Sequence, residues 1–403
     1  MDRAELRRHL ERLDAAVPAL GASSLIASIC SRPLPVSLPL EIQLLDKRLA
    51  LSKTVPNTTH PSWQTTAYGW VFCWAKEGSE VSTYTRPHLT YERQLESLKA
   101  RGLEVTDDDA ALSYLRRLGY YRLSAYWYPF RKSTIVTVDG KFSRKVEDDF
   151  HEGASFQSAV ELYVFDKRLR MLALDAIERI EVALRVDIAY GLGKRNTFAH
   201  CDPNELHGHF SKKRRGPKGR TDHEVWLEKL GETTARSKED FVKHYKDTYG
   251  LPLPIWVAIE IWDFGLLSRF YGGMKPQDRS DLSERFGVKD SSIMETWLRA
   301  VNYIRNIAAH HGRLFNRNMI DYPEFPLKGE IQIFDSVLHN INKYRPYATF
   351  CVISYLMQAI CPSTSWSRRF RDHLASFPKI AVPGCDIKSL GCHDEWMLEP
   401  FWQ

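Results

Sequence analysis

The stretch SFQSAVELYVFDKRLRMLALDAIERIEVALRVDIAYGL, from Ser155 to Leu192, is the longest helical pattern in the sequence. Its apolar residues recur at intervals of three and four, the spacing of one face of an α-helix. They are Phe156, Val160, Tyr163, Val164, Leu169, Leu172, Ile177, Ile180, Leu184 and Ile188. Ser155 is a good N-cap. At about 1.5 Å per residue, an unbroken helix spans more than about 50 Å, so we expect it to be the spine of a helical bundle.

Three further helical patterns complete the predicted bundle, near residues 255–271, 291–317 and 334–360. The first is nearly apolar on most sides, which is typical of a helix inside a bundle or at a subunit interface. A small hairpin is predicted at Ile135–Phe142, where the sequence alternates around an Asp-Gly pair. Shorter helices are expected at Thr90–Arg101, Asp107–Leu118, Lys238–Tyr249 and Lys275–Phe286. The sequence therefore predicts an all-α protein.

The stretch NYIRNIAAHHGRLFNR, from Asn302 to Arg317, has two unlike faces when it is drawn as a helix. One narrow polar stripe contains Asn302, Asn306, His310, Arg313 and Arg317. The opposite arc is apolar and includes His311 among Ile304, Ile307 and Phe315, so we expect His311 to be a core or partly buried residue. A surface helix does not need a polar face built from Asn, Arg and His instead of Lys and Glu. That choice of residues indicates a functional site.

The residue types in this stretch suit the cleavage of a phosphodiester. An imidazole, here that of His310, moves a proton near neutral pH. A guanidinium, here that of Arg305, stabilises the charge that builds on phosphorus. The two side chains diverge by about 140° on an ideal helix, but a long Arg can curl toward a phosphate bound over Asn306 and His310 because the residues beside it are small.

These residues resemble the R-x4-H motif of HEPN-superfamily ribonucleases, in which Asn commonly follows the Arg. In its longer form the chain is similar to the AbiD/AbiF-type abortive-infection proteins of bacteria. Two blocks at Arg86–Leu103 and Tyr114–Arg131, RPHLTYERQLESLKARGL and YLRRLGYYRLSAYWYPFR, carry the same resemblance. A third block, AIERIEVALR, lies at Ala176–Arg185. The resemblance covers roughly residues 84 to 360.

The resemblance implies a HEPN-like four-helix bundle that dimerises, so that two R-x4-H helices share one composite cleft. It implies a metal-independent endoribonuclease without a cofactor, acting as a toxin in phage defence. Arg305, Asn306 and His310 would be its catalytic residues. His310 would move the proton of the attacking 2′-hydroxyl or of the leaving oxygen, Arg305 would neutralise the transition state, and Asn306 would orient the imidazole or the phosphate. Its partners would be an RNA substrate and a small antitoxin-like RNA.

Two alternatives from other functional classes stay open. In the first, Arg305 and His310 only grip the phosphates of an RNA that the protein does not cut. In the second, the protein is purely structural and Arg305 pairs with Glu178 or Glu181. Glu181 and Arg185 have two interpretations of their own: a salt-bridged helix face, or support for the site from a neighbouring helix. Arg313 and Arg317 are further candidates for RNA contact or support.

A dense basic run occupies Ser211–Arg220, SKKRRGPKGR. Such runs are usually solvated, but this one would attract RNA phosphates from a distance. Its candidate RNA-binding residues are Lys212, Lys213, Arg214 and Arg215.

Just before this run, Arg195, Asn196 and His200 repeat the R-N-x3-H spacing. The neighbouring Gly and Pro residues predict a loop, and without a helix the spacing fixes no geometry. We therefore expect no catalytic role for this copy. The residues His200, Cys201, His207 and His209 match no zinc signature, so we predict no metal site here.

Aromatic residues are concentrated between Tyr120 and Phe130. They either belong to the core, as aromatic residues more often do, or stack on unpaired bases, as aromatic residues do in single-strand binders. Arg117, Arg122 and Arg131 are the better candidates for RNA contact in this region.

Composition permits these interpretations without deciding between them. The 56 basic and 50 acidic residues give a net charge of only +6, which permits nucleic acid as a partner. Seven scattered cysteines argue for a reducing cytoplasm instead of a disulfide framework. No stretch approaches the roughly 20 apolar residues of a membrane span, and the N-terminus does not resemble a signal peptide.

The domain boundaries follow the change in pattern. We expect an N-terminal helical region with the hairpin at 81–151, the bundle that carries the motif at 152–362, and a tail at 363–403 without periodic elements. Residues 1–80 are interrupted by prolines after a short helix at Arg3–Ala16. They are either an accessory segment or an artefact of a start codon placed upstream of the true one, with Val81 a candidate initiator.

Overall fold

The long helix predicted at Ser155–Leu192 is the centre of the protein and forms α5, Phe156–Gly193. In the computed structural model, the described residues are 85, 87–138, 141–215 and 219–403, and Leu89–Gln403 packs as one unit. The Oγ of Ser155 accepts a hydrogen bond of 3.0 Å from the backbone N–H of Ser158, which caps the first turn of α5 as predicted.

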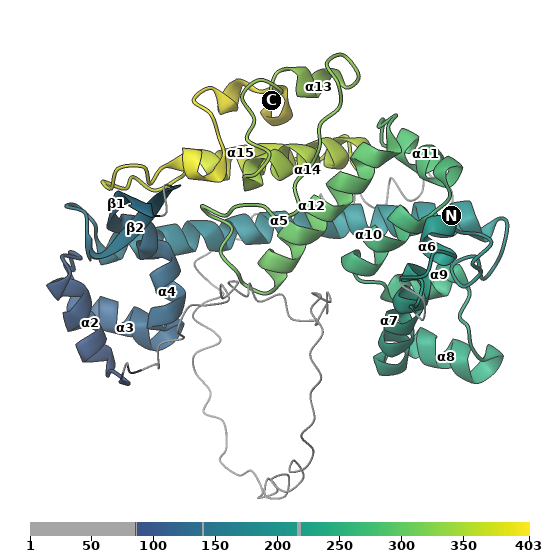
Figure 1. Ribbon diagram of the computed structural model, residues 1–403, viewed down its shortest axis with the longest axis horizontal. Coiled ribbons are helices and arrows are strands. Elements are labelled where there is room, and N and C mark those ends of the chain that lie inside the picture. The colour runs from purple at the N-terminus through teal and green to yellow at the C-terminus, as the bar shows by residue number, and fades with distance from the viewer. Residues whose placement is uncertain (1–84, 86, 139–140, 216–218) are drawn as a thin grey trace, which may run out of the picture. The chain divides into compact units, whose positions relative to one another are not determined.

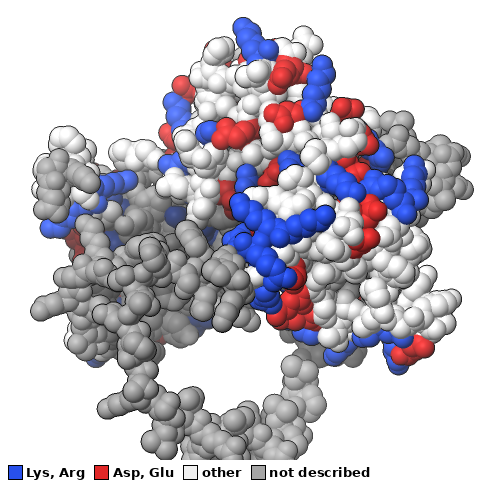
Figure 2. Space-filling view, turned by 45° about the vertical axis from the view of Figure 1, so that its right-hand side comes forward, with Lys and Arg blue, Asp and Glu red and all other residues white. Residues whose placement is uncertain are grey.

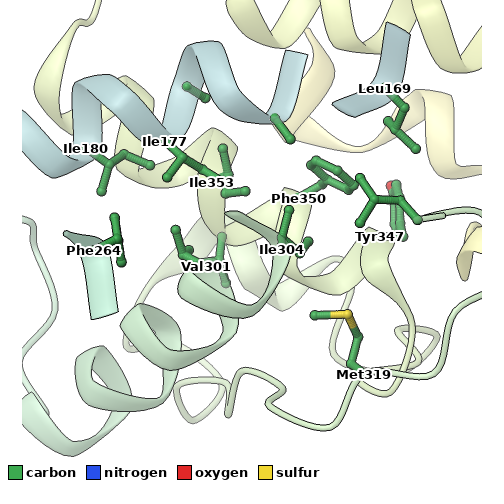
Figure 3. Packing of buried hydrophobic residues seen from close by; sticks show 14 of the residues in the cluster. Leu169, Ile177, Ile180, Phe264, Val301, Ile304, Met319, Tyr347, Phe350 and Ile353 are labelled. Carbon is green, nitrogen blue, oxygen red and sulfur yellow. The ribbon is translucent and has the colours of Figure 1, made fainter. Parts of the chain in front are cut away.

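Three helices pack against α5 and form the bundle: α10 (Phe264–Gly273), α12 (Ser291–Ala309) and α14 (Pro346–Ile360). Figure 1 shows α12 crossing α5. Figure 3 shows Ile177 and Ile180 of α5 close to side chains of α12 and α14, including Ile304 and Ile353. Each such fully buried side chain stabilises the fold by about 1.5–3 kcal/mol. The prediction of an all-α bundle is confirmed.

Two of the predicted helices are interrupted. The prediction of one continuous helix at 255–271 is wrong. The segment consists of α9 (Ile255–Ala258), η2 (Ile259–Ile261) and α10. The reason is Asp263, whose Oδ1 accepts a 2.7 Å hydrogen bond from the N–H of Leu266 and starts a new helix there.

The helix expected at 334–360 is also wrong in its first part. After the short α13 (Gln332–Asp335) the chain turns, and α14 begins only at Pro346. A proline fits the first turn of a helix because the N–H that it lacks has no partner there. Within α14, Ala348, Phe350, Val352 and Ile353 are all buried.

The N-terminal region follows its capping residues. The helices α2 (Tyr91–Ala100) and α3 (Asp108–Leu118) begin at Thr90 and Asp107, whose side chains accept hydrogen bonds from backbone N–H groups. The next helix is α4 (Tyr120–Trp127), and η1 (Tyr128–Phe130) follows it. The helices predicted at Thr90–Arg101 and Asp107–Leu118 are therefore confirmed, and both begin at a residue whose side chain caps the first turn.

The predicted hairpin is confirmed and is longer than expected. Strands β1 (Arg131–Val138) and β2 (Lys141–Phe150) pair antiparallel, with Ser133 opposite Val146. The turn residues 139–140 lie outside the described part of the chain.

The aromatic residues near α4 divide between core and surface. Tyr126, Trp127 and Phe130 are buried, as the core interpretation predicted, whereas Tyr121 is 88% exposed and Tyr128 is 49% exposed. The core interpretation is thus right for three of these side chains and wrong for Tyr121 and Tyr128.

The remaining helices lie around the bundle. They are α6 (Gly208–Ser211), α7 (Asp222–Arg236), α8 (Asp240–Tyr249), α11 (Pro276–Arg285) and α15 (Trp366–Ala375), with η3 (Ile387–Leu390), η4 (Trp396–Leu398) and η5 (Pro400–Trp402) in the tail. The prediction of a tail without regular elements is wrong. Trp366, Phe370 and Leu374 are four residues apart and bury one face of α15.

The expectations for Arg3–Ala16 and for the rest of residues 1–80 fall outside the described residues. Among the helices that are described, none is both long enough and apolar enough to span a bilayer.

Candidate functional site

The predicted motif lies at the C-terminal end of α12, and this helix is shorter than expected. It ends at Ala309 with His310 as its C-cap, so the prediction of a helix to Arg317 is wrong. The N–H of Gly312 bonds the carbonyl of Ile307 at 2.8 Å, and the N–H of His311 bonds the carbonyl of Ala308 at 3.1 Å. This pair of bonds is a Schellman motif, which turns the chain sharply out of the helix.

His311 occupies the position of this turn that glycine usually takes. Its φ is 58° and its side chain is exposed. The expectation that His311 belongs to the core is therefore wrong, because the chain leaves the helix before it. A left-handed conformation at a residue with a Cβ costs about 1–2 kcal/mol, so the surrounding structure must hold the turn in place.

Arg305 and Asn306 lie side by side on the last turn of α12, with 3.3 Å between the Arg305 Nη1 and the Asn306 Oδ1. Arg305 is partly buried, and Asn306 and His310 are exposed. Within the described chain, no carboxylate comes within 4.0 Å of the Arg305 guanidinium, and no group hydrogen-bonds the His310 imidazole. Both groups are therefore available to a ligand, and the alternative in which Arg305 forms an ion pair with Glu178 or Glu181 is not observed.

A buried carboxylate beneath the turn holds it in place. The Oδ1 of Asp166, on α5, accepts hydrogen bonds from the backbone N–H groups of Phe315, at 2.7 Å, and of Leu314, at 3.1 Å. Its Oδ2 accepts a bond of 2.8 Å from the Tyr126 hydroxyl and pairs with Arg170. Burial raises the pKa of Asp166, while Arg170, Tyr126 and the two N–H groups act in the opposite direction.

The network of Asp166, Arg170 and Tyr126 was not predicted from the sequence. Asp166 and Arg170 are an i, i+4 pair of opposite charge, and both side chains lie within the buried face of α5 between Phe165 and Ala173. A charged pair that interrupts an apolar stripe was the available signal, because such a pair is buried only where it has partners.

Arginine side chains of α4 and α5 also donate hydrogen bonds to the turn. The Nη1 of Arg122, on α4, donates to the carbonyl of His311 at 3.1 Å, and the Nη1 of Arg170 donates to the carbonyl of Gly312 at 3.4 Å. The turn is therefore tied to both α4 and α5.

Arg313 and Arg317, predicted to extend the polar stripe, lie beyond the end of α12. Arg313 donates to the carbonyl of Ala125, and burial lowers the pKa of its guanidinium. The Nε of Arg317 donates to the carbonyl of Arg313 at 2.7 Å. Both guanidinium groups thus bond protein atoms and stabilise the turn.

Glu181 and Arg185, on α5, form an ion pair. Arg185 also donates to the carbonyl of Trp262. Burial raises the pKa of Glu181, and the charges of Arg185 and Arg305 act in the opposite direction. The ion pair of the salt-bridged interpretation is therefore present, and support of the site by Glu181 and Arg185 stays a prediction.

The basic residues Lys212 to Arg215 are exposed just after α6, but acidic residues of α7 partly neutralise them. Arg215 lies 2.7 Å from Asp222, and Arg214 lies 3.4 Å from Glu224. On the face drawn in Figure 2, Lys and Arg side chains have Asp and Glu side chains among them. The patch therefore attracts an RNA less strongly than its sequence indicates.

The second R-N-x3-H copy is a structural loop, as predicted. The Arg195 guanidinium donates to both carboxylate oxygens of Asp278, at 2.6 and 2.8 Å, and to Glu205 at 3.0 Å. His200 is buried, and its burial lowers its pKa from 6.5 to about 4, with a smaller effect of His223. In the described residues, no three His, Cys, Asp or Glu side chains are grouped so that they could hold a metal ion.

The low pKa of His200 predicts a loss of stability in acid. Between pH 6.5 and about 4 the unfolded chain binds a proton at this residue and the folded protein does not, so stability falls as pH falls. The full contribution of this residue is about 3 kcal/mol, of which about 2 kcal/mol is lost between pH 6.5 and 4.5. Urea unfolding at pH 6.5 and 4.5 measures it. His200→Asn should flatten the pH dependence, and an unchanged slope in this variant would contradict the assignment.

Comparison with known proteins adds a family to this geometry. A model of the family described as Abi-like protein matches residues 113–316, about half of the chain. The matched segment runs from α3 through α4, α5 and α12 to the turn bound by Asp166. The comparisons found no match among curated proteins or solved structures.

Proposed function

Because the chain belongs to the Abi-like protein family, whose name indicates a role in abortive infection and phage defence, we propose that it is an endoribonuclease with Arg305, Asn306 and His310 in its active site. One observation carries the proposal. In the described chain the guanidinium of Arg305 has no ion pair and bonds only the side chain of its neighbour Asn306, and the imidazole of His310 bonds no group, although the turn after them is held by several bonds. Polar side chains that the fold holds in position without pairing them with another part of the protein are typical of a ligand-binding site.

The reaction that these groups support is transfer within the RNA itself. The 2′-oxygen attacks the adjacent phosphorus, the bond from phosphorus to the 5′-oxygen breaks, and the products are a 2′,3′-cyclic phosphate and a 5′-hydroxyl. His310 accepts the proton of the 2′-hydroxyl or donates one to the leaving oxygen. Arg305 stabilises the charge on the phosphoryl oxygens, which is greatest in the transition state. No step requires a metal ion.

One Arg and one His are a small catalytic set, because the reaction needs one group to remove the proton of the 2′-hydroxyl and a second group to protonate the leaving oxygen. A second copy of the chain would supply another Arg305 and His310 across the same cleft. The exposed position of Asn306 and His310 at the end of α12 supports this arrangement. A homodimer with a composite site, restrained by a small RNA in the bacterial cytoplasm, is therefore part of the proposal.

The test is cleavage of a mixed-sequence RNA by the purified protein in EDTA, with the ends of the products analysed. We expect 2′,3′-cyclic phosphate and 5′-hydroxyl ends. The matched control is the same strand with 2′-deoxy nucleotides at the mapped cut sites, which should stay intact because the attacking hydroxyl is missing. Cleavage of that control, or 5′-phosphate ends, would exclude this mechanism. RNA that is bound but never cut would favour the non-catalytic alternative.

A further inference from the structure

A groove opens on α5 one helical turn beyond the Glu181–Arg185 pair, on the side of α9 and η2. Its volume is about 450 Å³, within the range of pockets for small ligands. Its lining includes Arg185, Val186, Tyr190, Lys194, Trp256 and Glu260. The proposed catalytic set uses none of these residues.

Two large aromatic side chains in the groove are unusually open to solvent. Tyr190 is 61% exposed and Trp256 is 47% exposed, whereas six other tryptophans are fully buried. In the described part of the protein, neither ring is stacked on another aromatic side chain. An ideal Cβ on Gly193 would lie 3.3 Å from the Trp256 ring, so the missing side chain at this glycine lets the ring lie against α5. The Trp256 ring is therefore supported on one side and open on another.

The charges in the groove are unequally placed. The Lys194 ammonium lies 4.0 Å from the centre of the Tyr190 ring. The Glu260 carboxylate lies 3.9 Å from the Arg185 guanidinium. Arg185 is nine residues before Lys194 on α5. One end of the groove therefore attracts an anion and the other does not. Arg185 also has a buried Nε with no hydrogen-bond partner among the described residues.

We infer that this groove binds a nucleotide, with its base stacked on Trp256 and Tyr190 and its phosphate near Lys194. Base-aromatic stacking contributes substantially to the binding of single-stranded RNA and tolerates any base, because every base has a π-face. The groove lies on α5, the helix against which α12 packs, and its Arg185 is one turn from Glu181, with which it forms an ion pair. This position favours a nucleotide of the RNA strand near the cut phosphate over a free mononucleotide. In that form the inference rests on the proposed ribonuclease function.

The test measures binding separately from cleavage. A fluorescent 12-nucleotide RNA of mixed sequence is titrated into full-length His310→Ala protein, with and without Trp256→Ala or Tyr190→Ala. We expect each aromatic substitution to weaken binding by about 10- to 100-fold. Trp256→Phe should retain most of the affinity, and Tyr249→Ala, at an exposed tyrosine on α8, should change nothing. Lys194→Gln should lower the salt dependence of binding by about one phosphate contact.

The outcomes separate the possible occupants. Weaker RNA binding by Trp256→Ala places an RNA nucleotide in the groove. If only the binding of adenosine monophosphate depends on Trp256, the groove is a nucleotide site whose ligand is a free nucleotide and not part of an RNA strand. Unchanged binding of both ligands would overturn the inference. So would conversion of a dimer to a monomer by Trp256→Ala in sedimentation, because the groove would then be an interface between two copies.

The inference and the proposed function can fail separately. RNA binding that depends on Trp256, without any cleavage by the wild-type protein, would leave the groove standing and remove the ribonuclease. Cleavage with the same KM in the wild type and in Trp256→Ala would support the ribonuclease and contradict the nucleotide site in the groove. Thermal unfolding of Trp256→Ala and Trp256→Phe shows whether both variants are folded.

Discussion

His310→Ala should lower the rate of RNA cleavage by about 10²–10⁴-fold, which is the usual contribution of a positioned general acid or base. The imidazole is exposed at the C-cap of α12 and bonds no other group in the described chain, so its removal leaves the helix and the turn intact. We therefore expect RNA affinity to change by less than about threefold, since one exposed side chain contributes little to phosphate binding. Single-turnover cleavage measures the rate, and fluorescence anisotropy with a 2′-deoxy strand measures the affinity.

His244→Ala is the matched control, because His244 is an exposed histidine on α8, far along the chain from the motif. This variant should cleave at the wild-type rate. Equal rates for His310→Ala and the wild type would remove His310 from the mechanism. A parallel loss of affinity and rate in His310→Ala would instead assign it to RNA binding.

Asp166→Ala should lower the free energy of unfolding by about 3–5 kcal/mol, the usual effect of removing one partner from a buried ion pair. The Asp166 side chain is fully buried. Its loss leaves the Arg170 guanidinium without its carboxylate and the N–H groups of Leu314 and Phe315 without an acceptor. Because these bonds also hold the turn after His310, we expect cleavage to fall even at temperatures at which the variant stays folded. Urea unfolding and cleavage at 15 °C measure the two effects.

Two variants make this prediction specific. Asp175→Asn, at a half-exposed ion pair on the same helix, should cost no more than about 1 kcal/mol. Replacing both charges, as in Asp166→Leu with Arg170→Met, should recover part of the stability because no buried charge is left unpaired. It should not recover cleavage, since Leu cannot accept bonds from the turn. Equal stability of Asp166→Ala and Asp175→Asn would contradict the role of Asp166.

Much of the architecture could be read from local patterns. The helix α5 follows from apolar residues at intervals of three and four and from its cap Ser155. Thr90 and Asp107 start α2 and α3 for the same local reason, and alternation around a tight turn predicted the hairpin. Each of these features depends on residues within a few positions of one another. Periodicity and capping therefore indicate them without knowledge of the rest of the fold.

The candidate site was only partly predictable. The R-x4-H spacing identified Arg305, Asn306 and His310, and the structure places all three at one end of α12. The sequence did not show where that helix ends, because Leu314 and Phe315 continue the helical spacing of its apolar face. Both are buried in the structure, although they lie in the turn and not in the helix.

The sequence by itself thus determined the central helix α5 with its cap Ser155, the helices α2 and α3, the hairpin and the spacing of the residues in the motif. Only the tertiary structure decided that the chain leaves the helix at His310, since the carboxylate that receives the next N–H groups is 148 and 149 residues away, at Asp166. Only the tertiary structure brings Tyr190 and Trp256 into one groove. The physical reason is the same in both cases. A local pattern records which face of an element is apolar, whereas partners distant in the chain meet only when the elements pack.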